Sequence, residues 1–411
     1  MKQQRYISVF EHETLQTYEN EAGKFITPEQ LEALYGFNDR HGNKYFTPVR
    51  QGVKFAQYVG VIQIGRTTIE VLPKTDQSND THKWHNILLQ MLAECKKIKR
   101  ESVSEASLRK RENSLLDLYI EMYLDEVEKI IQSGFTKKYL RLQQQSTALK
   151  GKLIFDKHLR KNLIHKERFF TEYTIYTQDN LYNQVVKRGL EVIEKLNCSS
   201  SLKDRSNALL LYFHTVSDIK PTEKTFERLT ITRNTQRYKE ALYIAQLLIL
   251  NYSPDIKSGT EDLLAILFDM NQLWQEYILL QLKKSAPEGV SVYKGSKPFW
   301  ESQPIDPDIV IETADGFHIL DTKWKVLDQS KPSAADLKQM FAYNIYWNCQ
   351  KSILLYPKTD SSPDDFYGSY YEGFKEGHGC QLAYVNLLDL EGRLDKSFSK
   401  QVYRFTEIKC I

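Results

Sequence analysis

Apolar and polar residues alternate along two short stretches in the last third of the chain. Residues 307–311 read Pro-Asp-Ile-Val-Ile, and residues 319–324 read Ile-Leu-Asp-Thr-Lys-Trp. A period of two is typical of a β-strand with one buried face. Asp315-Gly316 lies between them and indicates a two-residue turn, because both positions of a type I′ turn need positive φ. The pattern therefore predicts a β-hairpin centred on Asp315-Gly316.

The predicted hairpin brings two carboxylates and an amine to one face. In this register Asp308 lies opposite Lys323 and diagonal to Asp321. Two neighbouring carboxylates repel each other unless a cation lies between them, and oxygen ligands suit Mg²⁺, with Mn²⁺ as a substitute. Such an ion would polarise a phosphoryl group, while Lys323 orients or deprotonates a water or stabilises developing negative charge. We expect a metal-dependent phosphodiesterase, although the short motif also fits an exposed hairpin with ordinary surface charges.

The periodicity around the hairpin adds context. Residues 335–343 predict a helix on which Gln339 and Tyr343 share a face, and residues 352–357 predict a buried strand ended by proline. Before the hairpin, helical spacing predicts a long helix from Glu261 to about Lys284, capped by Thr260. Helix, hairpin with acids, helix and strand is an order that resembles the PD-(D/E)xK nuclease core.

The whole chain predicts a multidomain protein of the α+β or α/β class. We expect a mixed β/α module over residues 1–145, a mostly helical region over 146–258 and a nuclease-like core over 259–411. Residues 58–74 predict a hairpin that turns at Gly65-Arg66. This stretch nearly matches a phosphate-binding loop, but arginine replaces the required lysine and a strand follows, so any nucleotide-driven motor is expected to be a different chain.

Residues 150–168 form the most basic segment, and aromatic residues interleave with the cations. Cations on such a surface can contact a DNA backbone. The alternative is a solvated helix face with an aromatic side in the core, and the pattern fits both. The candidate DNA-contacting residues are Lys152, Lys157, Arg160, Lys161, Lys166 and Arg168.

The composition says more about the cellular compartment of the protein than about the reaction it catalyses. The net charge of +3 over 411 residues does not itself indicate a nucleic-acid partner. The five cysteines are scattered without paired spacing, which favours a reducing cytosol. The start has no apolar signal sequence, and no apolar run approaches the length of a membrane span. We therefore expect a cytoplasmic protein without a membrane partner.

Several stretches together resemble the McrC family, the nuclease subunit of McrBC-type modification-dependent restriction systems. The similarity runs from about residue 58 to residue 356. It is carried by Val59-Gly60-Val61-Ile62-Gln63, Ile69-Glu70-Val71-Leu72-Pro73-Lys74, Ser114-Leu115-Leu116-Asp117-Leu118-Tyr119, Gly151-Lys152-Leu153, Leu163-Ile164-His165-Lys166-Glu167-Arg168-Phe169, Asp179-Asn180, Phe268-Asp269-Met270-Asn271 and the predicted hairpin.

The resemblance implies a role for each residue of the hairpin. Asp308 and Asp321 would bind the metal ion, with Thr322 as a further candidate ligand, and Lys323 would be the catalytic amine. The pair Gln339 and Tyr343 matches the family's Gln-x-x-x-Tyr helix, which supports the site. The chain departs from the pattern at one point: relatives tend to have Phe-Glu after Met-Asn, whereas Trp274-Gln275 stands here and Glu276 follows one residue later. No role is carried over to an acid at that position.

The resemblance also implies an activity and partners. The chain would be an Mg²⁺-dependent endonuclease subunit that cleaves modified, methylcytosine-containing double-stranded DNA. It would act in assembly with a hexameric McrB-like AAA+ GTPase, stimulating its hydrolysis through the N-terminal module, and cleavage of both strands could involve pairing of nuclease subunits. Gly65 and Arg66 are candidates for contact with the motor, although packing within the module fits them equally well.

Two other function classes fit the same sequence. A non-catalytic adaptor would only hold DNA or activate the motor, and it would have no use for the repelling carboxylate pair. A stand-alone PD-(D/E)xK repair nuclease would cleave DNA without any partner. Metal binding separates the first from a nuclease, and the requirement for a partner separates the second.

Overall fold

The computed structural model describes residues 5–20, 23–74, 80–98, 114–253, 262–325, 331–359, 362–370, 377–389, 393–395 and 397–406. The protein is of the mixed α/β class with several sheets, as the sequence predicted. It divides into two compact units. The first comprises residues 1–62, 67–115 and 267–411, and the second comprises residues 63–66 and 116–266. The functional regions predicted from the sequence (1–145, 146–258 and 259–411) stay a prediction.

A five-stranded sheet contains the predicted N-terminal hairpin. Its order is β1-β6-β5-β11-β10, with β1 and β6 parallel. The strands are β1 (Arg5–Phe10), β6 (Thr67–Leu72), β5 (Tyr58–Ile64), β11 (Leu263–Asp269) and β10 (Tyr252–Ser253). The boundary between the two units passes through β5 and β11. Because residues 58–72 form two strands, no phosphate-binding loop exists there.

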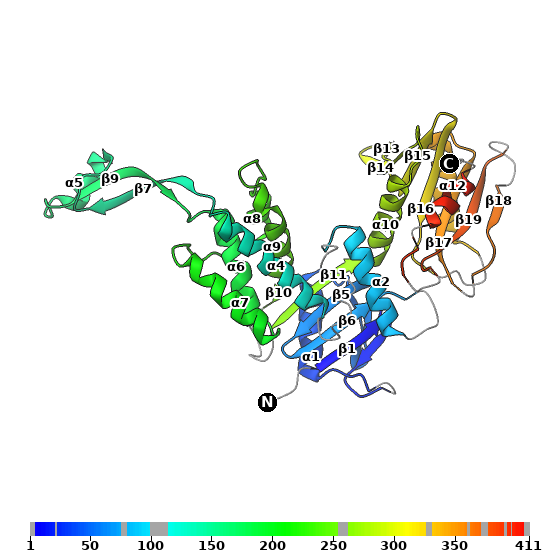
Figure 1. Cartoon of the computed structure of the whole chain (residues 1–411), viewed down its shortest axis with the longest axis horizontal. Coiled ribbons are helices and arrows are strands. Elements are labelled where there is room, and N and C mark those ends of the chain that lie inside the picture. The colour runs from blue at the N-terminus through cyan, green and yellow to red at the C-terminus, as the bar shows by residue number, and fades with distance from the viewer. Residues whose placement is uncertain are drawn as a thin grey trace. The chain divides into compact units, whose positions relative to one another are not determined.

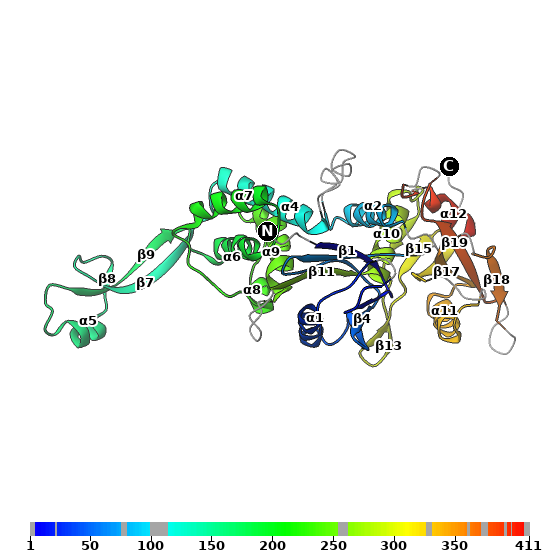
Figure 2. The same cartoon turned by 90° about the horizontal axis from the view of Figure 1, so that it is seen from below.

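Two helices cover opposite faces of this sheet (Figure 2). They are α1 (Pro28–Arg40), which begins with a capping box at Thr27, and α2 (Thr81–Glu94). Gln30 of α1 donates a hydrogen bond to the Thr67 hydroxyl, and His85 of α2 contacts Glu70 at 2.8 Å. Residues 67 and 70 of one strand point to opposite faces, which explains why the two helices lie on different sides. A smaller sheet next to α1 contains β2 (Thr14–Gln16), β4 (Gly52–Phe55) and β3 (Phe46–Val49).

The long helix predicted before the hairpin is only partly correct. Residues 263–269 form the strand β11, and the helix α10 (Met270–Lys284) begins after Asp269, whose side chain accepts hydrogen bonds from the N–H groups of Asn271 and Gln272. A short apolar run such as Leu263–Ile266 fits a buried strand and a helix equally well by periodicity. Thr260 and Glu261, the predicted start, lie outside the described residues.

The last third of the chain builds a six-stranded sheet between two helices. The order is β12-β15-β16-β17-β19-β18, and the β16–β17 and β17–β19 pairs are parallel. Helices α11 and α12 cover opposite faces: α12 lies in front of the sheet in Figure 1, and Figure 2 shows α11 on the other side. The elements are β12 (Ser291–Tyr293), β15 (Ile309–Thr313), β16 (Gly316–Thr322), α11 (Ala334–Trp347), β17 (Lys351–Lys358), β18 (Phe366–Ser369), β19 (Gly379–Asn386) and α12 (Phe398–Phe405), with a separate β13 (Lys297–Trp300) and β14 (Gln303–Ile305) ribbon.

The predicted hairpin forms, but its register differs by two residues from the prediction. Thr313 pairs with Gly316 and Ile309 with Leu320, so the loop residues are Ala314 and Asp315. The Thr313 hydroxyl accepts the N–H of Asp315, and this side-chain turn takes the place of the predicted type I′ turn. Extended by one residue, the observed register sets Asp308 opposite Asp321, and the predicted pairing of Asp308 with Lys323 is wrong.

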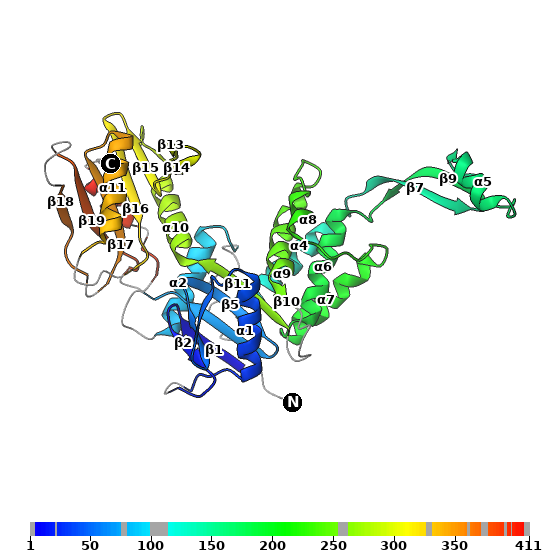
Figure 3. The same cartoon turned by 180° about the vertical axis from the view of Figure 1, so that it is seen from behind.

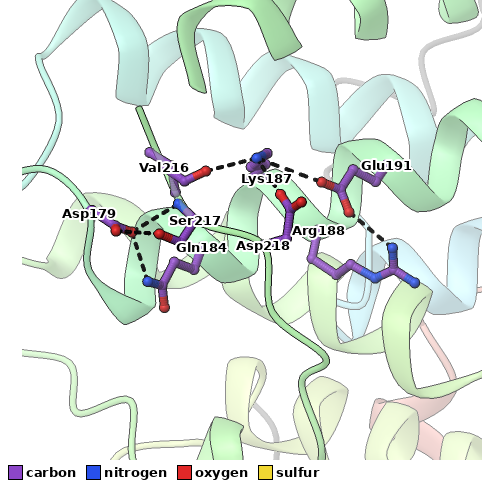
Figure 4. Close-up of polar contacts among 8 residues, drawn as sticks. All are labelled: Asp179, Gln184, Lys187, Arg188, Glu191, Val216, Ser217 and Asp218. Atoms are coloured by element: carbon purple, nitrogen blue, oxygen red, sulfur yellow. Dashed lines mark hydrogen bonds and ion pairs between the residues drawn. The ribbon is translucent and has the colours of Figure 1, made fainter. Parts of the chain in front are cut away.

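The second unit is mainly helical. Its helices include α4 (Leu115–Gln132), α6 (Leu181–Lys195), α7 (Ser200–Leu210), α8 (Glu223–Glu227), α9 (Lys239–Leu250) and the 3-10 turns η2 (Leu211–Phe213) and η3 (Gln236–Tyr238). A polar network fixes the start of α6 (Figure 4). In it Asp179 accepts hydrogen bonds from Ser217 and Gln184, and Lys187 donates to the Val216 carbonyl and to Asp218.

A long two-stranded arm extends from these helices (Figure 3). It consists of β7 (Lys138–Ser146) and β9 (Phe169–Thr177), paired over nine residues, with β8 (Lys152–Leu153) and α5 (Phe155–Asn162) at its tip. No strand was predicted over residues 138–146. Most of β7 is exposed, so it has no alternation of buried and polar residues from which a strand could be recognised.

Within the described parts of the chain, no helix combines the length and apolar character needed to cross a bilayer. Cys95, Cys198, Cys349 and Cys380 are buried free thiols. Cys410 lies outside the described residues.

Gly189 allows the close packing of α6 on α4 and generates a stability prediction. A Cβ atom at this position would lie 2.2 Å from the Tyr123 hydroxyl, which is itself bonded to the Val186 carbonyl. We expect Gly189→Ala to lower the free energy of unfolding by about 1–3 kcal/mol through overpacking. Thermal unfolding followed by circular dichroism measures this effect.

Gly36, in α1, supplies the matched control. A Cβ atom there meets nothing within 4 Å. We expect Gly36→Ala to leave the unfolding midpoint unchanged or to raise it, because alanine favours the helix by about 0.5–1 kcal/mol. Equal destabilisation by the two substitutions would contradict the packing argument.

Candidate active site

Asp308 lies in the turn that leads into β15, and the neighbouring strand holds its carboxylate. Its Oδ2 accepts a hydrogen bond of 2.7 Å from the Thr322 N–H and one of 2.9 Å from the Thr322 hydroxyl. The preceding Pro307 is buried, and Asp308 is half-buried. Thr322 thus orients Asp308 through two donors, while Oδ1 is not used in these bonds.

Asp321 lies near the end of β16 and forms the buried part of the site. Its residue is 2 % exposed, and the Lys323 ammonium lies 2.7 Å from its Oδ2. The contact is a short, charge-assisted ion pair. Lys323 also lies 3.6 Å from Asp336 Oδ1, and Lys325 contacts the other oxygen of Asp336 at 2.8 Å.

The charges of these groups shift one another's pKa values. Burial, followed by repulsion from Asp308, raises the pKa of Asp321 to about 6 despite the attraction of Lys323. Burial alone would lower the pKa of Lys323, but the carboxylates of Asp321 and Asp336 outweigh it and raise that pKa. Lys323 is therefore an ammonium cation at neutral pH in the metal-free protein.

On helix α11, Gln339 and Tyr343 share a face, as the sequence spacing predicted. Exposed Gln339 donates a hydrogen bond of 2.7 Å to the Tyr343 hydroxyl, which donates one of 3.0 Å to the Asp306 carbonyl. Tyr343 is buried, and burial raises its pKa, so it stays a neutral donor. Both residues therefore hold the turn before Asp308, whereas their catalytic role stays a prediction.

Sequence reasoning missed Asp336 as a partner of Lys323. Burial would raise the pKa of Asp336, but hydrogen bonds from Lys325 and Ser333 outweigh it and lower that pKa. Ser333 caps α11 by accepting from the Asp336 N–H. Ser-x-x-Asp before an apolar run is a helix-start signal, so the location of Asp336 could have been found, although its contact with Lys323 could not.

The residues present fit a divalent ion that keeps part of its water shell. The carboxylate of Asp321 is buried and is repelled by that of Asp308. Within the described residues, no three His, Cys, Asp or Glu side chains gather as a metal site. Two carboxylates suffice for Mg²⁺, which is usually bound through one or two carboxylates and several waters.

Glu276 of α10 is not part of this cluster. Its carboxylate forms an ion pair of 3.0 Å with Lys97, close to the end of α2. The contact gives Glu276 a structural role between the two helices.

The predicted DNA-contacting residues lie together at the tip of the arm. All six are exposed. Lys157 and Lys161 lie over the ring of Phe170, at 5.6 and 4.9 Å from its centroid, and Lys157 also donates to Gln143. Phe170 is buried whereas Phe155 is 68 % exposed, so only part of the aromatic set forms a core side.

The tip of the β5–β6 hairpin has contacts of its own. The Gly65 N–H donates a hydrogen bond of 2.9 Å to the Asp262 carbonyl, and Arg66 is exposed. Gly65 therefore has a structural role within the fold. Contact of Arg66 with a motor stays a prediction.

A family comparison gives this cluster its context. The sequence model of the family described as "McrBC 5-methylcytosine restriction system component" matches residues 53–357, three quarters of the chain. The chain belongs to this family. The matched range includes the hairpin with Asp308, Asp321 and Lys323, and it includes the helix with Gln339 and Tyr343.

A curated relative agrees with the family match. The chain is 20 % identical over 280 residues to the Escherichia coli (strain K12) protein "Type IV methyl-directed restriction enzyme EcoKMcrBC", a match that covers 61 % of this chain and 79 % of that protein.

Two solved structures have a similar fold. A chain from the refined half-complex of Thermococcus gammatolerans McrB AAA+ hexamers with bound McrC is similar at a TM-score of 0.69 and 18 % identity, over 97 % of this chain and all of the other. A chain of the Thermococcus gammatolerans McrBC complex is similar at a TM-score of 0.51 and 19 % identity, over 69 % and 88 %.

The raised pKa of Asp321 generates a prediction about stability. The folded protein holds this proton more tightly than the unfolded chain, so this group's contribution to the free energy of unfolding falls as the pH rises from about 4 to about 6. We expect Asp321→Asn to raise the free energy of unfolding of the metal-free protein at pH 7 by about 1–3 kcal/mol. Urea denaturation in chelator at pH 4.5 and pH 7 measures the gain, which should be smaller at pH 4.5.

Glu312, an exposed acid on the same hairpin, provides the control. Glu312→Gln should change stability little at either pH. A loss of stability at pH 7 in Asp321→Asn would contradict the electrostatic argument.

Proposed function

We propose that this chain is the DNA-cleaving component of a McrBC-type restriction system and acts as a metal-dependent endonuclease. The observation that carries the proposal is the meeting of Asp308, Asp321 and Lys323 at the end of one hairpin. Support comes from the family match over the same residues and from a mixed sheet flanked by α11 and α12, which resembles a PD-(D/E)xK core.

Each residue has a distinct task in this proposal. Asp308 and Asp321 hold Mg²⁺ or Mn²⁺, which when bound supplies Lewis-acid polarisation of the scissile phosphodiester. Thr322 orients Asp308 through its N–H and hydroxyl, and it remains a candidate ligand through its backbone. Because the pKa of Lys323 is raised, its ammonium favours stabilisation of negative charge on the phosphoryl oxygens over abstraction of a proton from water.

Gln339 and Tyr343 act on the same centre through the backbone. Their hydrogen bonds end at the Asp306 carbonyl, two residues before Asp308. This chain of donors fixes the turn from which Asp308 approaches Asp321.

A motor partner belongs to the same proposal. We infer assembly with a hexameric AAA+ GTPase of the McrB type, supported by the fold shared with a chain from McrB hexamers with bound McrC. The substrate would be double-stranded DNA that contains methylcytosine, in the cytoplasm, and cutting of both strands would use two nuclease subunits. The near-match to a phosphate-binding loop at residues 60–67 forms strands, so GTP hydrolysis is assigned to the partner.

An adaptor without activity is the second candidate function. The observation that favours it is the small number of acids at the centre, since no group of three or more candidate metal-binding side chains occurs in the described parts of the chain. Isothermal calorimetry with Mn²⁺ separates the two: a nuclease should release or absorb heat on binding, and Asp321→Ala should abolish that signal. Heat that persists in Asp321→Ala would favour the adaptor.

The proposed centre makes a prediction about activity. Asp308→Asn and Lys323→Ala should each lower the cleavage rate of methylated duplex DNA about 100- to 1000-fold, because each removes a principal electrostatic group. The assay contains Mg²⁺, GTP and the AAA+ partner. Stimulation of GTP hydrolysis should be retained, since it is assigned to the N-terminal module.

Glu312→Gln serves again as the control on the same hairpin and should cleave at the wild-type rate. Full cleavage by Lys323→Ala would end the catalytic assignment. Cleavage by the wild type without the partner would favour a stand-alone repair nuclease.

The tip of the arm generates a separate prediction about DNA affinity. Arg160 and Lys166 are exposed. If each contacts a phosphate, the double variant Arg160→Ala/Lys166→Ala should reduce the slope of log K against log[salt] by about 2, at about 1 per contact. Fluorescence anisotropy with duplex DNA in chelator measures the slope.

Two exposed lysines of the same unit, Lys224 and Lys239, lie outside the arm. The double alanine variant at these positions should leave the slope unchanged. Equal slopes for wild type and the arm variant would exclude the tip from DNA binding.

A further inference from the structure

Glu11 is a buried acid that directly follows β1, far from the candidate active site in sequence. It is 6 % exposed. Its Oε1 accepts two hydrogen bonds, one of 3.0 Å from the Lys74 N–H and one of 2.6 Å from the indole N–H of Trp324. The first bond joins Glu11 to the segment after β6, and the second joins it to the segment after β16. A single carboxylate oxygen therefore connects the N-terminal sheet with the strand that carries Asp321.

Trp324 is the residue next to Lys323, and its surroundings leave it little freedom. It is 7 % exposed, and its ring lies 5.3 Å from that of Trp274 on α10. The Lys323 N–H donates a hydrogen bond of 2.9 Å to the Leu355 carbonyl of β17. The backbone at Lys323 and Trp324 is consequently held by β17 on one side and by Glu11 on the other.

The contact is directional, which distinguishes it from ordinary packing. Burial raises the pKa of Glu11 to about 7, and its Oε2 has no hydrogen bond within the described residues. An apolar side chain could fill the same space without the cost of burying a carboxyl group. What the carboxyl group adds is an acceptor for the indole N–H, and with it one fixed orientation of Trp324.

We propose that Glu11 is a positioning residue of the nuclease centre, which acts through the indole of Trp324 to fix the direction in which Lys323 leaves β16. The inference rests on the proposed function. It adds that the N-terminal module contributes a residue to the geometry of the centre. The module cannot move relative to β16 without breaking a buried hydrogen bond.

Two variants test the link at its two ends. Glu11→Ala removes the acceptor, and Trp324→Phe removes the donor while keeping an aromatic ring. Each should lower kcat for cleavage of methylated DNA about 10- to 100-fold, the usual range for residues that orient the groups of a metal site, and should leave KM for DNA unchanged. Glu11→Gln retains an oxygen acceptor and should restore most of the rate.

A measurement without metal or activity completes the test. The protein is labelled with 5-fluorotryptophan, and the resonance of Trp324 is assigned by its absence in Trp324→Phe. In chelator, Glu11→Ala should shift this resonance, whereas Glu11→Gln should leave it near the wild-type position. A resonance that is unmoved in Glu11→Ala would overturn the proposal.

Glu94 is the matched control, because it is an equally buried acid of the same unit. It is 7 % exposed and accepts hydrogen bonds from Gln281 and Lys284 of α10. Glu94→Ala should lower stability and leave kcat unchanged. If Glu94→Ala and Glu11→Ala lose kcat equally, general destabilisation explains the loss, and the inference is overturned.

The outcomes separate this inference from the proposed function. If Lys323→Ala abolishes cleavage while Glu11→Ala and Trp324→Phe cleave at the wild-type rate, only the positioning role falls. If Lys323→Ala cleaves normally, the nuclease assignment falls first. Should Glu11→Ala fail to fold, as judged by circular dichroism, Trp324→Phe decides the question.

Discussion

Repulsion between two carboxylates is the constraint that organises the last third of this protein. Asp308 and Asp321 occupy adjacent strand ends. Asp308 is half-buried, and Asp321 is almost fully buried. Burial and the charge of Asp308 raise the pKa of Asp321. Without a metal ion the repulsion opposes folding, and a divalent ion between the two carboxylates would relieve it. Without a metal ion, the buried carboxylate pair costs folding free energy. Ordinary exposed charges on a surface hairpin would not have this cost.

Support for this pair comes from three directions. From α11, Asp336 pairs with Lys323, and Tyr343 holds the turn before Asp308. From β17, the Leu355 carbonyl fixes the Lys323 backbone. From the N-terminal sheet, Glu11 holds Trp324. Because these supports come from distant parts of the sequence, the geometry of the site depends on the complete first unit, and a fragment limited to the C-terminal sheet would lack the third support.

The sequence could predict features that depend on interactions between residues close together in the chain, but not those that depend on distant residues. The hairpin and the Gln339–Tyr343 pair are local, so a period of two and an i, i+4 spacing were enough to find them. The register was missed because the Thr313 hydroxyl selected a different turn, and the arm was missed because an exposed strand has no apolar alternation. The contacts of Lys323 with Asp336 and of Glu11 with Trp324 depend on tertiary packing, which no local pattern encodes.

The discontinuous first unit has a consequence for synthesis of the chain. The two residues of the Glu11–Trp324 bond are separated by 313 positions. At translation rates of about 5–20 residues per second, Glu11 waits about 15 to 60 s on the ribosome before its indole partner has been made. The inserted helical unit and all five strands of the first sheet are made during this interval, so both can form before Glu11 meets its partner. Nascent chains would therefore complete the candidate active site late, because Asp336, Tyr343 and Leu355 are made after Trp324.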